Sequence, residues 1–297
     1  MKRLQQEEKA AKTRTSIIHQ EEQKKHREMT LRREQEGRRR RLLTLLAEVD
    51  IVAKHDTTSR RRQTDTATWI LDDDKFKSFM QSAEAECLCC FGIVGSGKTF
   101  TSSSVIDYLT EQHGRTDFVS YHYFDHADKR SLSFNSFLSA VLRQLVLRYG
   151  WPPMVEEKLV EISDKGWLSI SEPALVELIL SAWSANCPAL FLIVDGVDEL
   201  SEGEQQKLLS FLIQLNTQQG IVPKSFITCR LGEGHLDEQL ARVQTYSIVI
   251  AAQTVASDIQ KIISQSLDAW QPALSQLDVT ALKAEINQVL ATQGEGM

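Results

Sequence analysis

The sequence predicts an α/β fold in which a parallel sheet lies between two layers of helices. Short apolar runs, typical of buried strands, alternate along the chain with longer stretches of helical periodicity. A glycine-rich loop joins the first of these strands to a helix. Such alternation is typical of parallel sheets, because two parallel strands need a crossover connection that is usually a helix.

The predicted elements follow one another from residue 87 to residue 250. The strand candidates are residues 87–91, 118–124, 190–194, 225–228 and 245–250. The helix candidates are residues 100–109, 133–149, 172–186 and 202–219. Beyond residue 250 the pattern becomes helical, and residues 255–270 and 279–291 would form the start of a small helical lid.

Residues 92–99 match the phosphate-loop pattern G-x-x-x-x-G-K-[ST] between a strand and a helix. Glycines let successive backbone N–H groups turn towards an anion, and the start of the following helix adds a favourable dipole. Lys98 would reach the β- and γ-phosphates, and the Thr99 hydroxyl would hold Mg²⁺. The predicted nucleotide-binding residues are Gly92, Gly95, Ser96, Gly97, Lys98 and Thr99.

A nucleotide site of this type also needs acidic residues that hold the metal, and such residues follow the apolar run 190–194. Asp195 stands where a Walker B carboxylate would meet Mg²⁺, directly or through a water. Asp198 and Glu199 lie just beyond the strand end, where parallel sheets bind ligands. Either acid is a candidate to orient or deprotonate the attacking water, and the sequence does not choose between them.

The order of an apolar strand, Asp195, a small residue and two further acids resembles the NACHT family of signal-transducing P-loop NTPases. Residues 69–76, 121–125, 131–145 and 227–230 are similar to segments of fungal NOD-like receptors (NLRs) in that family. The resemblance extends over about residues 60–297. The sequence departs from the family pattern at Val94, where proline is frequent, at Cys229, where serine is frequent, and after Arg230, where no proline follows.

This resemblance implies the three-layer P-loop NTPase sandwich with strand order 5-1-4-3-2. It also implies that Arg230 detects or neutralises the γ-phosphate, a role that suits a planar, permanently charged guanidinium. The alternative for Arg230 is a surface arginine that ends a strand. Relatives of this type continue into a winged-helix region and usually a repeat domain, so the sequence reads as a truncated receptor, a fragment or an isolated switch module.

Charge separates a basic extension, residues 1–62, from the rest of the chain. The change to a helical pattern then separates an NTPase core, residues 63–250, from a partial helical subdomain, residues 251–297. The extension has 18 Lys and Arg against 10 Asp and Glu, about +8, so the rest carries about −14 of the total of −6. Leu4, Ala11 and Ile18 keep a heptad spacing that fails at Lys25. We expect a solvated or partner-binding helix rather than a self-sufficient coiled coil.

The sequence favours a cytoplasmic protein, because it has neither a signal-peptide pattern nor an apolar run long enough to span a bilayer. The basic run 38–41 reads as the charged end of a linker helix in preference to a nuclear address or a nucleic-acid or membrane patch, since no aromatics interleave it. Three of the five cysteines lie on the strand before the phosphate loop, where alternating side-chain directions disfavour a metal site.

The predicted function is a switch that binds ATP or GTP with Mg²⁺ and hydrolyses it slowly or not at all. It would control partner recruitment or oligomerisation, which the NLR resemblance places in innate-immunity or incompatibility signalling. Expected partners are the nucleoside triphosphate and proteins that bind the N-terminal helix or the NACHT core. The alternative is a nucleotide-bound scaffold that acts through the N-terminal helix. A metabolite kinase or a GTPase is disfavoured, because no Asn-Lys-x-Asp guanine-reading motif is present.

Overall fold

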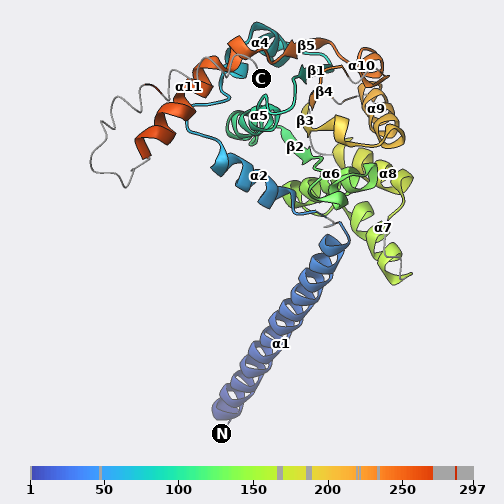
Figure 1. Cartoon of the computed structure of the whole chain (residues 1–297). Coiled ribbons are helices and arrows are strands. Elements are labelled where there is room, and N and C mark those ends of the chain that lie inside the picture. The colour runs from blue at the N-terminus through green and yellow to red at the C-terminus, as the bar shows by residue number, and fades with distance from the viewer. Residues whose placement is uncertain are drawn as a thin grey trace.

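Five parallel strands form one sheet with helices on both of its faces (Figure 1). The computed structural model describes residues 2–46, 49–165, 170–184, 189–218, 220, 222–232, 235–269 and 285. The strands are β1 (Glu86–Phe91), β2 (Phe118–Tyr123), β3 (Ala189–Asp195), β4 (Val222–Cys229) and β5 (Tyr246–Val249). All five strand predictions are thus confirmed, with ends that agree to within three residues.

The spatial order of the strands is β2-β3-β4-β1-β5, which is the predicted order 5-1-4-3-2 counted from the other edge. Strand β4 therefore lies between β1 and β3, with Phe91 opposite Cys229 and Val194 opposite Ile227. Because the strands are parallel, the loop after β1 and the acidic segment after β3 leave the sheet at the same edge. Strand β4 reaches that edge between them.

Apolar residues on the two sides of the sheet form two separate cores, as the pleat of a strand requires. In β1, Cys87, Cys89 and Phe91 belong to one core, whereas Leu88 and Cys90 belong to the other. Every residue of β1 is buried. This continuous burial explains the unbroken apolar run in the sequence, since helices cover both faces of the strand.

The helices form two layers, one on each core. One layer contains α3 (Trp69–Asp72), α4 (Asp74–Gln81) and α5 (Lys98–Gln112). The other contains α6 (Phe134–Tyr149), α7 (Pro153–Asp164), α8 (Glu172–Ser184), α9 (Glu202–Asn216) and α10 (His235–Leu240). Short 3₁₀ turns occupy Lys129–Ser131 (η1) and Val197–Glu199 (η2), and α11 (Ala252–Ala269) follows β5. The fold is the predicted three-layer α/β sandwich.

Several predicted helix limits need correction. The helix after the loop begins at Lys98 rather than residue 100, and the helix predicted to residue 219 ends at Asn216, with Thr217 as its C-cap. Ser133 precedes α6 as its N-cap, because its hydroxyl accepts a hydrogen bond from Ser136 N. Helices α3, α4, α7 and α10 were not predicted. The candidate helix 279–291 lies outside the described residues, except for residue 285.

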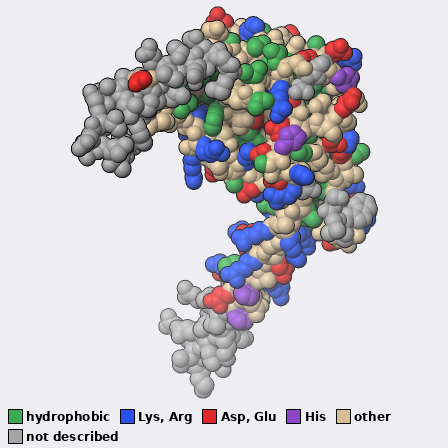
Figure 2. All heavy atoms as spheres, in the orientation of Figure 1, with side chains coloured by type: hydrophobic (Ala, Val, Ile, Leu, Met, Phe, Trp, Pro, Cys, Tyr) green, Lys and Arg blue, Asp and Glu red, His purple; other side chains and the backbone are tan. Residues whose placement is uncertain are grey.

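The N-terminal arm consists of two helices that differ in their contact with the core. Helix α1 (Lys2–Leu45) projects as a rod (Figure 1), and residues 19–36 are all exposed. Figure 2 shows Lys and Arg side chains along this rod. Helix α2 (Ile51–Arg61), by contrast, packs on α5. Within the described part of the chain, no helix combines the length and apolar character that crossing a bilayer requires.

Candidate functional site

The loop between β1 and α5 needs its glycines for two different physical reasons. Gly95 and Gly97 have φ angles of 80° and 88°, in the left-handed region that side chains with a Cβ rarely adopt. Gly92 leaves little room for a side chain, because a Cβ there would lie 2.3 Å from the Ser96 hydroxyl oxygen, which would have to move, and 3.3 Å from Ile250 Cβ. The sequence therefore folds the loop tightly back over the end of β1.

Lys98 begins α5 and turns its side chain back over the loop. Its Nζ donates hydrogen bonds to the carbonyl oxygens of Gly92, at 2.7 Å, and Ile93, at 2.9 Å. The Lys98 side chain also lines a cavity of about 280 Å³, called here the loop cavity. The residues that line it are Val94, Gly95, Ser96, Gly97, Lys98, Thr99, Phe100, Asp195, Gly196, Asp198, Glu199, Thr228 and Arg230.

Asp195, at the end of β3, is fixed in place by three hydroxyl groups. Its carboxylate accepts hydrogen bonds from Thr99 Oγ1 at 2.8 Å, Ser102 Oγ at 2.7 Å and Thr228 Oγ1 at 2.6 Å. Burial raises the pKa of Asp195, and these hydrogen bonds act in the opposite direction by stabilising the charged form. The carboxylate is thus held at the sheet edge by donors from both α5 and β4.

Gly196 shows why a small residue follows Asp195. Its φ angle is 75°, and a Cβ at this position would lie 2.8 Å from the carbonyl oxygen of Phe124. The chain after β2 and the chain after β3 therefore approach too closely for any side chain between them. Gly196 N also donates a 3.1 Å hydrogen bond to Thr228 Oγ1, which ties the turn to β4.

Asp198 and Arg230 form a pair at one wall of the loop cavity. Asp198 Oδ2 lies 3.0 Å from Arg230 Nε, and Asp198 Oδ1 accepts a 3.0 Å hydrogen bond from Arg230 N. The Asp198 side chain is only 3% exposed, whereas that of Arg230 is 41% exposed. Asp198 therefore uses its carboxylate to hold the arginine, and the arginine faces the open part of the cavity.

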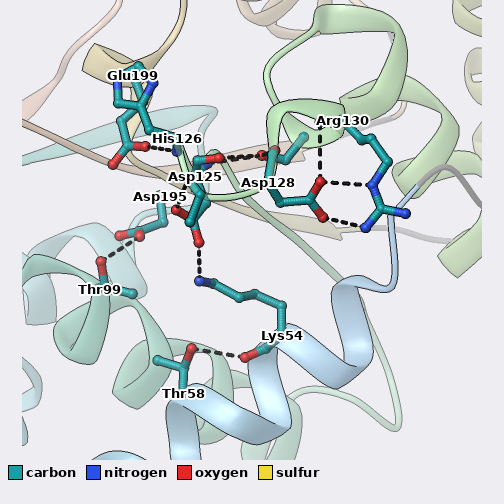
Figure 3. A network of polar contacts seen from close by, with 11 residues as sticks. Lys54, Thr58, Thr99, Asp125, His126, Asp128, Arg130, Asp195 and Glu199 are labelled. Atoms are coloured by element: carbon teal, nitrogen blue, oxygen red, sulfur yellow. Dashed lines mark hydrogen bonds and ion pairs between the residues drawn. The ribbon is translucent and has the colours of Figure 1, made fainter.

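Glu199 has a different environment from Asp198, although the two are neighbours in the sequence. Its Oε2 accepts a 2.5 Å hydrogen bond from the backbone N–H of His126, just beyond β2 (Figure 3). Burial raises the pKa of Glu199, which the His126 N–H partly opposes and the negative charges of Asp125 and Asp198 reinforce. The structure thus separates the two acids that the sequence left equivalent.

The loop cavity brings together every predicted site residue except Gly92, whose carbonyl lies behind it as a partner of Lys98. Three contributors were not predicted. Ser102 stands three residues after Thr99 on α5, so the helical period could have indicated it. Thr228 acts from the neighbouring strand and His126 through its backbone, and neither leaves a signal in a local motif.

The chemistry of these groups suits an anion that carries a hard divalent cation. Lys98 and Arg230 supply positive charge at the loop cavity. The Thr99 hydroxyl and the Asp195 carboxylate, which touch one another at 2.8 Å, are oxygen ligands of the kind that Mg²⁺ takes while keeping several waters. These two residues therefore fit a Mg²⁺ site between the phosphate loop and the end of β3.

A second cavity of about 380 Å³, called here the apolar cavity, adjoins the loop. Among the described residues that line it, Ser96 alone has a polar side chain. The lining is Ile93, Val94, Gly95, Ser96, Ile250, Ala251, Ala252, Val255, Ile259 and Ile263. It shares Val94, Gly95 and Ser96 with the loop cavity, and α11 forms its opposite wall. The same loop residues therefore contribute to both cavities.

A family model described as Nephrocystin 3, N-terminal, matches residues 65–230. A search of curated proteins gave no match.

Similar solved structures include the Aeropyrum pernix ORC1 protein in complex with DNA, with 17% identity, a TM-score of 0.43 and coverage of 85% of this chain and 63% of that one. The Walker-type ATPase paby2304 of Pyrococcus abyssi has 10% identity, a TM-score of 0.43 and coverage of 79% and 67%. The Aeropyrum pernix ORC2 protein, in ADPNP and ADP complexes, has 12% identity, a TM-score of 0.38 and coverage of 67% and 49%. The chain thus spans about half the length of ORC2.

Proposed function

The chain belongs to the nephrocystin 3 N-terminal family through residues 65–230, and we propose that it is a switch that binds ATP with Mg²⁺ at the loop cavity. One observation carries the proposal: the phosphate loop and Asp195, far apart in sequence, meet in a direct Thr99–Asp195 hydrogen bond. This contact supports one shared site for the predicted anion and the predicted cation.

The phosphates would lie against the loop and the first turn of α5. There the backbone N–H groups and the helix dipole favour an anion. Lys98 would exchange its carbonyl partners, Gly92 and Ile93, for phosphate oxygens, so the ammonium remains hydrogen-bonded in both states. Thr99 and Asp195 would hold Mg²⁺, which when bound neutralises phosphate charge.

The apolar cavity is our candidate for the base. Its walls are aliphatic side chains, with Ile93 on the loop side and Val255 and Ile259 on α11. A purine ring would be covered on both faces there, and the lack of charged side chains among the described lining residues favours adenine over guanine, whose polar edge needs more partners. We therefore propose ATP in preference to GTP.

The switching step would involve α11. Because this helix forms one wall of the apolar cavity, a bound base would contact both α11 and the loop and thereby favour one position of the helix. Such a shift requires that the nucleotide bind one arrangement more tightly than the other. The C-terminal helical segment would thus report the nucleotide state.

Hydrolysis, as proposed, is a slow reset in which Glu199 accepts a proton from the attacking water. Glu199 suits this role because it lines the loop cavity and burial raises its pKa above the usual value, which makes it a better proton acceptor. Asp198 would be a positioning residue for Arg230, and the Arg230 guanidinium would face the γ-phosphate. The two neighbouring acids therefore receive separate roles.

The signalling context rests on the resemblance to NACHT proteins of the fungal NLR type. The exposed rod of α1 supports a role in recruiting protein partners, because residues 19–36 are all exposed. We propose a cytoplasmic signalling protein that recruits partners or oligomerises according to the bound nucleotide. The second candidate, a non-hydrolysing scaffold, keeps the nucleotide as a structural element and assigns recruitment to α1.

Competition binding tests the proposal. A fluorescent ATP analogue is bound to the purified chain and displaced with ATP, ADP, GTP or GDP, with and without Mg²⁺, while phosphate release is followed. We expect saturable binding that Mg²⁺ strengthens and that ATP displaces better than GTP. Absence of binding contradicts the proposal. If alanine at Asp195, Asp198 and Glu199 changes neither phosphate release nor partner recruitment, the scaffold is favoured.

A further inference from the structure

Asp125 stands where the N-terminal arm meets the edge of the sheet that carries the site (Figure 3). Its Oδ2 forms an ion pair with Lys54 Nζ of α2, and its Oδ1 accepts a 2.8 Å hydrogen bond from Ala127 N. Its own N–H donates to Ser131 Oγ at 2.9 Å. Asp125 is thus fixed on one side by its own turn and on the other by a side chain of the arm.

The two residues that flank Asp125 contact both acidic positions of the site. Phe124 N donates a 2.9 Å hydrogen bond to the carbonyl oxygen of Asp195. His126 N donates the 2.5 Å hydrogen bond to Glu199 Oε2. Any displacement of Asp125 therefore moves the backbone amide on which the Glu199 carboxylate depends.

Helix α2 is itself anchored to the helix that follows the phosphate loop. Asp107 of α5 accepts hydrogen bonds from His55 Nε2 at 3.0 Å, Ser59 Oγ at 2.8 Å and Arg62 Nη2 at 2.7 Å. Lys54 therefore reaches Asp125 from a helix that is held on the core. The Lys54 and Asp125 side chains remain 37% and 28% exposed, so their ion pair can open without unfolding the core.

We propose that Lys54 is a positioning residue for Glu199: by fixing Asp125, it holds the His126 amide that orients the Glu199 carboxylate. Lys54 lies outside residues 65–230, which match the family, so the arm would contribute to chemistry in the core. This inference rests on the proposed hydrolytic role of Glu199. A protein that binds the arm and detaches α2 from the core would break the Lys54–Asp125 ion pair and thereby slow nucleotide turnover.

The contact predicts a specific kinetic signature. With one oxygen held by the His126 N–H, the other Glu199 oxygen is left to accept a proton from water. Loss of the anchor would let the carboxylate turn away, which lowers kcat. Lys54 bonds to Asp125 and Thr58 and is not among the described residues that line the loop cavity, so the KM for ATP should not change.

The test is steady-state phosphate release by the full chain carrying Lys54→Met or Lys54→Arg. We expect Lys54→Met to lower kcat about three- to tenfold without changing KM, and Lys54→Arg to restore most of the rate because it keeps the charge. Arg39→Met is the matched control. It removes another ion pair between the arm and the core, Arg39 to Glu156 at 2.7 Å, and should leave kcat unchanged.

A double-mutant cycle separates positioning from a structural effect. In a Glu199→Gln background, Lys54→Met should cause no further loss of kcat, whereas fully additive losses contradict the inference. Asp125→Asn tests the same contact from the other side and serves if Lys54→Met fails to fold. An unchanged kcat in the folded Lys54 or Asp125 variant also contradicts it.

The outcome for the unmodified chain distinguishes this inference from the proposed function. If the chain binds ATP but releases no phosphate, the role of Lys54 is refuted while the nucleotide-binding proposal stands. If the chain binds no nucleotide at all, the proposed function itself fails. Phosphate release that responds equally to Lys54→Met and Arg39→Met indicates a general effect of arm docking and overturns the specific link to Glu199.

Discussion

A hydrogen bond of 2.8 Å joins the hydroxyl of Thr99 to the carboxylate of Asp195, although the two residues lie 96 positions apart. The strand order creates this meeting, because β4 is the only strand between β1 and β3 in the described sheet. Thr228 of β4 donates to the same carboxylate at 2.6 Å. The sheet thus joins the phosphate loop and the acidic segment into one site.

Replacing Lys98 by alanine should weaken ATP binding about 10- to 100-fold, because it removes a charge-assisted contact worth roughly 1.5–3 kcal/mol. Titration with a fluorescent ATP analogue measures the change. Lys207→Ala is the matched control, since Lys207 pairs with Glu172 and Glu204 and does not line the loop cavity. Equal affinity of the Lys98 variant and the unmodified chain would refute the role given to this lysine.

The two neighbouring acids should respond differently to neutral substitution. Glu199→Gln should reduce phosphate release by about 100-fold or more while ATP still binds, because general bases typically contribute 10²–10⁴-fold. Asp198→Asn removes the charge that pairs with Arg230, so it should weaken ATP more than ADP. Phosphate release and nucleotide affinity are measured for both variants. Identical profiles would contradict the division of roles.

Gly92→Ala should disturb the loop from within. The added methyl would lie 2.3 Å from Ser96 Oγ and 3.3 Å from Ile250 Cβ, so the Ser96 hydroxyl must move. We expect a loss of about 1–3 kcal/mol in the free energy of unfolding, as is typical of overpacking, together with weaker ATP binding. Urea denaturation and the ATP-analogue titration measure the two effects.

Gly203→Ala is the control for that experiment. Gly203 lies in α9. Apart from its chain neighbours and the nearby backbone of its own helix, no atom lies within 4 Å of a Cβ at this position. Alanine in a helix should raise the free energy of unfolding by about 0.5–1 kcal/mol and leave ATP binding unchanged. If both glycine variants behave alike, close packing at Gly92 is not what requires glycine there.

Acid pH should weaken the packing of α2 on α5, because it protonates Asp107. Burial raises the pKa of Asp107, but hydrogen bonds from His55 and Ser59 and the charges of His55 and Arg62 outweigh it, so the net pKa is lowered. A carboxyl whose pKa is lower in the folded state stabilises the fold above its unfolded pKa of about 3.9, and that contribution disappears as the pH falls through the folded value. Below about pH 5, the free energy of unfolding should therefore decrease more steeply for the unmodified chain than for Asp107→Asn.

Urea denaturation at a series of pH values between about 3 and 7 provides this comparison. Asp74→Asn is a suitable control, because Asp74 is an exposed carboxylate in the first turn of α4 and does not belong to the Asp107 cluster. Parallel pH curves for the unmodified chain and Asp107→Asn would show that the Asp107 cluster does not stabilise the fold electrostatically.

The strands were predictable because burial on both faces leaves continuous apolar runs, as in β1 and β3. Their order was predicted from the resemblance to the NACHT family, because periodicity within a strand does not indicate which strands lie beside it. Helix α7 was missed although Val155, Leu159 and Ile162 are buried at helical spacing and Pro153 opens its first turn. Helix α10 has only six residues, too few for a periodic pattern.

The part of the site that could be predicted consists of residues in short local motifs. Lys98, Thr99 and Asp195 belong to such motifs, and the structure places them around one cavity. The environments of Asp198 and Glu199 differ because Asp198 contacts Arg230, just after β4, and Glu199 contacts the backbone of His126, just after β2. Every residue except proline has a backbone N–H, so no sequence pattern could have predicted that the His126 amide binds Glu199.

Calorimetric titration of ATP with and without Mg²⁺, into the unmodified chain and into Asp195→Asn, tests the central claim most directly. We predict one site per chain whose affinity Mg²⁺ increases in the unmodified protein, and a variant in which most of that increase is lost while metal-free binding persists. Absence of binding heat in the unmodified chain, or an equal Mg²⁺ effect in both proteins, would contradict a shared phosphate and metal site at Thr99 and Asp195.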